Sequence, residues 1–131
     1  MVRLRTLVCM ADDVSTYELF QRGVSLLEAG DYEAATVPLG KAAAREPEKS
    51  SVREALGRAL FRAHRYGEAA GEFEAVVERY PVNDYAHFCL GRSLSLSGQV
   101  ERARRHLAIA ANLRPDRRDY RVYRDRLAPS G

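Results

Sequence analysis

The most constraining feature of this chain is a repeat with a period of about 34 residues. Six columns of residues keep this register: a glycine, a proline, an alanine, two positions that are always bulky and apolar, and one that is mostly aromatic. They are Gly23, Gly57 and Gly91; Pro47, Pro81 and Pro115; Ala35, Ala69 and Ala103; Leu26, Leu60 and Leu94; Leu39, Phe73 and Leu107; and Tyr32, Tyr66 and Val100. Because self-similarity at such a period is the signature of stacked supersecondary units, the chain is predicted to be a repeat protein.

Each repeat is predicted to be a pair of packed helices. Gly23 and Leu26 lie at i and i+3 on the first helix, and Ala35 and Leu39 lie at i and i+4 on the second, so each pair shares one helical face. The glycine and the alanine allow the two helix axes to approach to the short end of about 8–10 Å. A proline such as Pro47 cannot continue a helix and closes the repeat.

These signals predict an all-α chain of seven helices. The expected spans are 15–28, 31–45, 50–63, 66–79, 84–97, 100–113 and 116–128. Candidate N-caps are Ser15, Ser51, Asn83 or Asp84, and Asp116. The repeats cover about 16–49, 50–83 and 84–117 in a domain of residues 13–128. Residues 1–12 are expected to be a flexible tail. Translation could begin at either Met1 or Met10.

Two segments depart from the repeat template. The last helix, 116–128, lies outside the three repeats, and Tyr120, Tyr123 and Leu127 give it a narrow apolar stripe on a charged background, which predicts a solubilising cap. Pro38 lies about seven residues into the second helix, where proline costs about 3 kcal/mol, so we expect a kink or a late helix start. A bent helix would shape a contact surface, and the alternative is sequence drift tolerated on a surface-facing helix.

The template of glycine, leucine, aromatic, alanine, bulky apolar residue and closing proline resembles the tetratricopeptide repeat family. The resemblance covers about residues 16–115, which is three full repeats. It implies a right-handed α-solenoid of three helix pairs with a C-terminal capping helix. It also implies a noncatalytic protein-interaction module, an adaptor or scaffold, in which the first helices of the repeats line a concave groove that binds a peptide or protein segment.

The resemblance further implies which side chains face this groove. Family groove positions are the second, fifth, sixth and ninth of each repeat, counted here from Thr16, Ser50 and Asp84. The candidate groove residues are Tyr17, Phe20, Val24, Glu54, Arg58, Tyr85, Phe88 and Arg92. The alternative for the aromatic residues is burial between helices or beneath the N-terminal segment.

The expected partner is an unidentified protein or peptide of apolar and acidic character. Family members that clamp the C-terminal carboxylate of chaperones carry lysine, asparagine and arginine at the slots held here by Phe20, Val24, Ala55, Tyr85 and Cys89. A chaperone-tail adaptor is therefore disfavoured. An apolar or aromatic segment flanked by acids, which Arg58 and Arg92 could pair, suits the groove better.

Other kinds of function have little support in the sequence. His64, His87 and His106 do not have metal-ligand spacing, no glycine-rich phosphate loop follows a strand, and no nucleophile has an oriented base, so we expect no metal, no cofactor and no enzyme. No apolar run approaches the roughly 20 residues of a membrane span, so no membrane association is expected. The two cysteines, Cys9 and Cys89, favour a reduced cytoplasmic setting, and the dominance of arginine over lysine favours a bacterial source.

One alternative function rests on the C-terminal charge. Between Arg102 and Arg126 nine arginines stand against three aspartates, a local charge of +6. A basic patch of Arg117, Arg121 and Arg124 could bind an acidic protein partner or the phosphates of nucleic acid, of which nucleic acid is the less expected. The alternative is that these arginines form a solvated face without a ligand. A homo-oligomer that uses the first helix is a third possibility.

Overall fold

A computed structural model of the chain describes residues 14–129. Within these residues the chain forms seven helices and no strand, which confirms the predicted all-α fold. The helices are α2 (Thr16–Glu28), α3 (Tyr32–Arg45), α4 (Ser50–Arg62), α5 (Tyr66–Arg79), α6 (Asp84–Leu96), α7 (Val100–Leu113) and α8 (Arg118–Arg126). The tail predicted over residues 1–12 and the choice between Met1 and Met10 lie outside the described residues.

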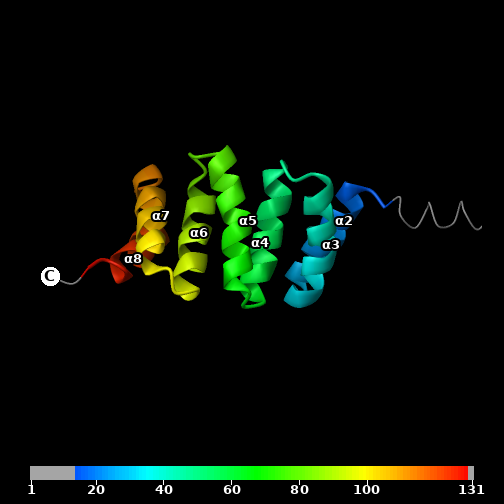
Figure 1. The fold of residues 1–131 in the computed structure, drawn as a ribbon, viewed down its shortest axis with the longest axis horizontal. Coiled ribbons are helices and arrows are strands. Elements are labelled where there is room, and N and C mark those ends of the chain that lie inside the picture. The colour runs from blue at the N-terminus through cyan, green and yellow to red at the C-terminus, as the bar shows by residue number, and fades with distance from the viewer. Residues whose placement is uncertain (1–13, 130–131) are drawn as a thin grey trace, which may run out of the picture.

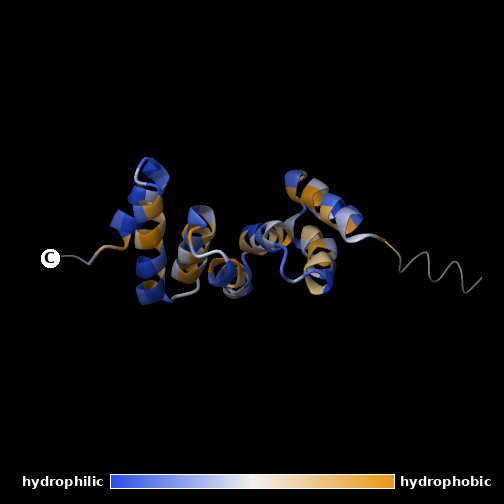
Figure 2. Ribbon diagram, turned by 90° about the horizontal axis from the view of Figure 1, so that it is seen from above, coloured by the Kyte–Doolittle hydropathy of each residue, from blue (hydrophilic) through white to orange (hydrophobic). Residues whose placement is uncertain are grey.

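The helices are arranged as a solenoid. They stand side by side in chain order, from α2 at one end to α7 and α8 at the other (Figure 1). Seen from above, the row is curved, because the helices at both ends rise above those in the middle (Figure 2). Within residues 14–129 no helix is both long and apolar enough to cross a membrane.

The repeat period continues beyond the third repeat. The first helices α2, α4 and α6 begin at Thr16, Ser50 and Asp84, and α8 begins one further period along the chain, at Arg118. The predicted start of the last helix at residue 116 is therefore two residues too early. In the repeat register, α8 is the first helix of a fourth repeat whose second helix does not follow within the described residues.

Small residues set the distance within each helix pair, as the sequence predicts. A Cβ atom built on Gly23 would stand 2.3 Å from Leu39 Cγ, and one built on Gly91 would stand 2.7 Å from Leu107 Cγ. Ala35, on the second helix of the first repeat, is completely buried. Because these positions have no room for a larger side chain, the two helices of a pair pack at short range.

Side-chain caps begin two of the first helices. Ser15 Oγ accepts a hydrogen bond from the Glu18 backbone N–H at 3.1 Å, and Asn83 Oδ1 accepts one from the Ala86 backbone N–H at 3.0 Å. Both bonds satisfy donors that the first turn of a helix otherwise leaves free. The predicted caps at Ser15 and Asn83 are confirmed.

The caps predicted at Ser51 and Asp116 are wrong. Helix α4 already begins at Ser50, so Ser51 lies inside its first turn. Asp116 precedes α8 by two residues, and its carboxylate accepts two hydrogen bonds from the Arg114 guanidinium, both at 2.9 Å. A charge-assisted bidentate pair is stronger than a single capping bond, which explains the difference.

Pro38 lies within α3, which runs without interruption from Tyr32 to Arg45. The alternative of a late helix start is therefore wrong. A proline has no backbone N–H, so the carbonyl of Ala34, four residues earlier, receives no helical hydrogen bond from this position. The ring is partly exposed, which places the interruption at the edge of the core.

Candidate peptide-binding groove

Helices α4 and α6 form a cleft of about 470 Å³ together with the end of α2, the start of α3 and one residue of α5. Its walls combine aromatic rings and arginines over an apolar floor. The lining residues are Leu27, Glu28, Tyr32, Arg58, Phe61, Arg62, Phe73, Tyr85, Phe88, Cys89 and Arg92. The cleft therefore offers both apolar surface and guanidinium groups to a ligand.

Arg92 stands between two aromatic rings from neighbouring first helices. Its guanidinium carbon lies 5.2 Å from the centroid of the Phe61 ring on α4 and 4.2 Å from that of the Tyr123 ring on α8. Both distances are within the range of a cation–π interaction. The rings hold the arginine in place while they leave its N–H groups free of any hydrogen bond or ion pair within residues 14–129.

Arg62 and Tyr32 form the wall of the cleft near α2. Arg62 Nη2 donates a hydrogen bond to Tyr32 Oη at 2.5 Å, and the guanidinium carbon lies 4.6 Å from the centroid of the same ring. This contact joins the end of α4 to the start of α3. It is a fixed part of the wall, in contrast to Arg58, which is exposed and makes no ion pair with a described residue.

Tyr85 and Cys89 are one turn apart on α6 and are both neutral. Partial burial raises the pKa of Tyr85, and burial raises the pKa of the Cys89 thiol to about 12. A thiol with such a pKa is a poor nucleophile near neutral pH, because only the thiolate reacts readily. The two side chains therefore supply a weakly polar surface between Arg58 and Arg92.

The structure gathers four of the eight predicted groove residues in this cleft: Arg58, Tyr85, Phe88 and Arg92. Glu54 does not line it, and its Oε1 accepts a hydrogen bond from Asn83 Nδ2 at 2.7 Å. That bond joins the N-terminal half of α4 to the residue before α6.

The other three predicted groove residues lie on α2. Tyr17, Phe20 and Val24 line a shallow depression that is separate from the cleft. Tyr17 is 67% exposed, and its hydroxyl accepts a hydrogen bond from Gln21 Nε2 at 2.9 Å. The predicted groove is thus divided into a cleft over α4 and α6 and an open face of α2.

Phe88 has a second role besides lining the cleft. Its ring stacks on Tyr120 of α8 with centroids 4.6 Å apart and meets Tyr123 edge-on at 5.5 Å. Tyr120 is completely buried, and its hydroxyl donates a 2.7 Å hydrogen bond to Asp84 Oδ2. Phe88 therefore helps to attach α8 to the third repeat.

Four residues of the site were not predicted from the sequence: Tyr32, Phe61 and Arg62 line the cleft, and Tyr123 contacts Arg92 beside it. Phe61 and Arg62 lie in the last turn of α4, beyond the four family groove positions, and Tyr123 lies on α8, the predicted capping helix. A signal was present for Tyr123, because it lies one repeat period after Cys89.

The three arginines of the predicted basic patch all donate hydrogen bonds within the chain. Arg117 donates two hydrogen bonds to Asp119, at 3.1 and 2.8 Å, and Arg124 Nε donates to Asp125 Oδ1 at 2.9 Å. Arg121 Nη1 donates to the carbonyl of Pro115. Each of the three arginines thus already has an acceptor from the chain itself.

No group of three histidine, cysteine, aspartate or glutamate side chains among residues 14–129 is arranged to hold a metal ion. The histidines instead form local contacts. His87 and His106 stack with ring centroids 5.3 Å apart, and His64 contacts the Tyr66 hydroxyl.

Comparison with known proteins agrees with this architecture. The family model described as Tetratricopeptide repeat matches residues 26–87. This part of the chain therefore matches the tetratricopeptide repeat family. No curated protein matches its sequence.

Solved tetratricopeptide repeat structures superpose over most of the chain. MamA from Desulfovibrio magneticus RS-1 is 24% identical in sequence and superposes with a TM-score of 0.83. The match covers 88% of the present chain and 66% of the MamA chain, so the present chain spans just under two thirds of that relative. MamA from MSR-1 is 25% identical with a TM-score of 0.81, over 89% and 67% of the two chains. The first tetratricopeptide repeat domain of Spaghetti (RPAP3), bound to the HSP90 peptide SRMEEVD, is 16% identical with a TM-score of 0.80, over 86% and 89%.

Proposed function

We propose that this tetratricopeptide repeat protein is a noncatalytic interaction module that binds a peptide or protein segment in the cleft over α4 and α6. The observation that carries the proposal is the pair of arginines, Arg58 and Arg92, which lack an acidic partner within residues 14–129 in a cleft walled by aromatic rings. Aromatic residues and arginine are enriched among the residues that dominate binding energy at interfaces.

The partner segment proposed is apolar or aromatic and carries acidic groups. Phe61, Phe88 and Tyr85 offer ring surface, while the guanidinium groups can form bidentate bonds with carboxylates. The Spaghetti (RPAP3) domain, which shares the fold, is seen with a peptide bound. That likeness supports a peptide as the kind of ligand, whereas the slots held by Val24 and Cys89 argue for a different peptide sequence from a chaperone tail.

The basic end of the chain is the weaker candidate for a binding surface. Arg117 and Arg124 are paired with aspartates, so an incoming phosphate or carboxylate would compete with an existing ion pair. A ligand that binds Arg58 or Arg92 in the cleft would not have to displace an ion pair with a described residue. We therefore place the binding function in the cleft, in a cytoplasmic adaptor.

Selection from a library of random displayed peptides tests this proposal. Binders should be enriched in aspartate or glutamate next to an aromatic residue, and Arg92→Glu should weaken their affinity at least tenfold by titration calorimetry. Lys41→Glu is the matched control, because it makes the same charge change at an exposed position on α3 and should leave affinity unchanged within twofold. Binders without acidic residues, or equal losses in both variants, would contradict the proposal.

A further inference from the structure

The repeat register places three arginines at one position of successive first helices. Arg58 on α4, Arg92 on α6 and Arg126 on α8 are each one repeat period apart. The third of them lies on the helix that was predicted to be only a cap. Residues at the same repeat position lie on the same face of a solenoid, so α8 extends the line of positive charge begun by the other two helices.

Tyr123 connects Arg126 to the cleft. The guanidinium carbons of Arg92 and Arg126 lie 4.2 and 4.8 Å from the centroid of the Tyr123 ring. Two cations therefore share one aromatic ring, and neither forms an ion pair or a hydrogen bond within residues 14–129. Like charges gathered at one ring repel each other, and an anion placed beside them would relieve that repulsion.

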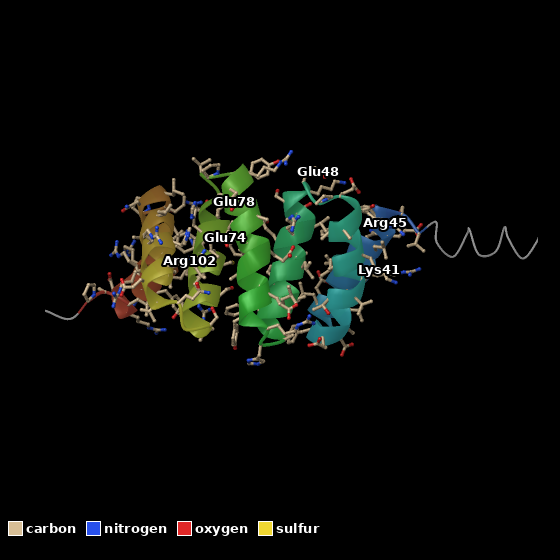
Figure 3. All side chains as sticks on the ribbon, in the orientation of Figure 1. Lys41, Arg45, Glu48, Glu74, Glu78 and Arg102 are labelled. Carbon is tan, nitrogen blue, oxygen red and sulfur yellow. The ribbon has the colours of Figure 1, made fainter. Side chains whose placement is uncertain are left out.

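Some arginines elsewhere on the molecule are held by ion pairs between helices. On the second helices Arg102 Nη2 lies 2.6 Å from Glu74 Oε1, and the two side chains meet between α7 and α5 in Figure 3. Arg65 Nη1 similarly lies 2.7 Å from Glu33 Oε1. Cross-helix ion pairs thus hold arginines elsewhere in this chain, whereas Arg58, Arg92 and Arg126 line up on the groove face without an ion pair to any of residues 14–129.

The end of α8 is held in place by contacts that do not use Arg126. The Arg104 guanidinium on α7 donates a hydrogen bond to the carbonyl of Leu127, the residue after the helix. At the other end, the buried Tyr120 hydroxyl bonds to Asp84. Arg126 is exposed, so its side chain is available to a ligand while the backbone beneath it is fixed.

We propose that α8 completes the binding groove, and that the groove takes an extended acidic segment whose carboxylates are read in sequence by Arg58, Arg92 and Arg126. This inference rests on the proposed function and adds the class of ligand and a specificity-determining residue. A peptide is favoured over nucleic acid, because Glu28 lines the same cleft and would repel a continuous phosphate backbone, whereas a peptide can place neutral residues there.

The probe is an array of synthetic, C-terminally amidated peptides in which a phenylalanine lies between two glutamates with spacers of zero to five alanines. Each peptide has a twin with glutamine in place of glutamate, and binding is measured by fluorescence anisotropy at physiological salt. Long-spaced peptides, which reach α8, should lose at least tenfold in affinity on Arg126→Glu, while short-spaced peptides should change less than twofold.

Arg124→Glu is the matched control, because Arg124 also lies in the last turn of α8 but is paired with Asp125. It should leave the affinity for all peptides within twofold. The thermal midpoint of both variants, followed by circular dichroism, separates loss of binding from loss of folding. Arg126→Gln should give an intermediate affinity, since it removes the charge without reversing it.

The outcomes distinguish this inference from the function on which it rests. If Arg92→Glu abolishes binding while Arg126→Glu binds long peptides like the wild type, the groove is real and the role of α8 is refuted. If no glutamate peptide binds better than its glutamine twin, the acidic ligand class is refuted. If oligothymidylate binds more tightly than every peptide and Arg126→Glu abolishes that binding, the ligand is nucleic acid and the proposal is overturned.

Discussion

Gly57 and Phe73 pack so closely that a single methyl group could not be added between them. A Cβ atom on Gly57 would stand 2.7 Å from Cζ of the Phe73 ring, which is almost fully buried. We expect Gly57→Ala to lower the free energy of unfolding by about 1–3 kcal/mol, the usual range for overpacking a core. Urea denaturation followed by circular dichroism measures this change.

Gly71→Ala is the control for that experiment. Gly71 lies in the interior of α5, is exposed, and has no atom within 4 Å of its built Cβ position. Alanine there should stabilise the protein by about 0.5–1 kcal/mol, because it restricts the unfolded chain and favours the helix. Equal effects of the two substitutions would show that helix propensity, and not contact, decides both.

Phe88→Ala should destabilise the protein as well as weaken binding. The substitution removes the ring that stacks on Tyr120 and meets Tyr123, so the attachment of α8 loses both contacts. Because Phe88 is only partly buried, we expect a loss of about 2 kcal/mol, below the usual cost of truncating a fully buried phenylalanine. An unchanged unfolding midpoint in urea would show that α8 is held by its other contacts alone.

Pro38→Ala should raise the free energy of unfolding by about 1 kcal/mol. The alanine restores the N–H that bonds the carbonyl four residues earlier in α3, although the gain is smaller than the full penalty because the helix has relaxed around the ring. Calorimetric melting of the variant checks the sign. A lower melting temperature would mean that the local shape of α3 is needed for packing.

Stability should fall as the pH drops from about 7 to 5. Burial, the neighbouring His87, and Arg102 and Arg105 lower the pKa of His106, and Glu74 opposes them. The folded protein therefore binds fewer protons than the unfolded chain below the ordinary histidine pKa of about 6.5, so acidification favours unfolding.

The geometry of the histidine pair gives the structural cause of this dependence. His87 Nε2 lies 2.8 Å from the carbonyl of Pro81, to which it must donate, and His87 Nδ1 lies 3.1 Å from His106 Nδ1. His87 Nδ1 then accepts a hydrogen bond from His106 Nδ1–H, and a further proton on His106 would place a positive charge on a half-buried ring near Arg102 and Arg105. Thermal melts of His106→Gln should show a flatter pH dependence over this window than those of the wild type.

The sequence predicted the repeat fold well because its signals are local and repeated. Gly23, Leu39 and Pro47 each recur at the same spacing, and the helices begin and end within two residues of the predicted positions. The errors fall where two local interactions compete. Asp116 is a good N-cap by type, but Arg114 lies two residues away and takes its carboxylate.

The candidate site was predicted only in part, since family positions identify faces and not neighbours. Tyr17 and Phe88 both occupy groove positions, yet Tyr17 is mostly exposed and Phe88 stacks on the Tyr120 ring, which belongs to the next first helix along the chain. Tyr123 was missed because the glycine and leucine of the repeat template do not continue into α8.

The sequence by itself determined the period, the helix pairs and the close contacts of glycine with the second helix, because these depend on the size and helical spacing of residues near one another in the chain. Only the tertiary structure decided that α8 takes the place of another first helix, and that Arg92 and Arg126 meet at Tyr123. Contacts between successive repeats join residues that are distant in the chain, and whether an arginine there is paired or free depends on which side chains the superhelix brings beside it.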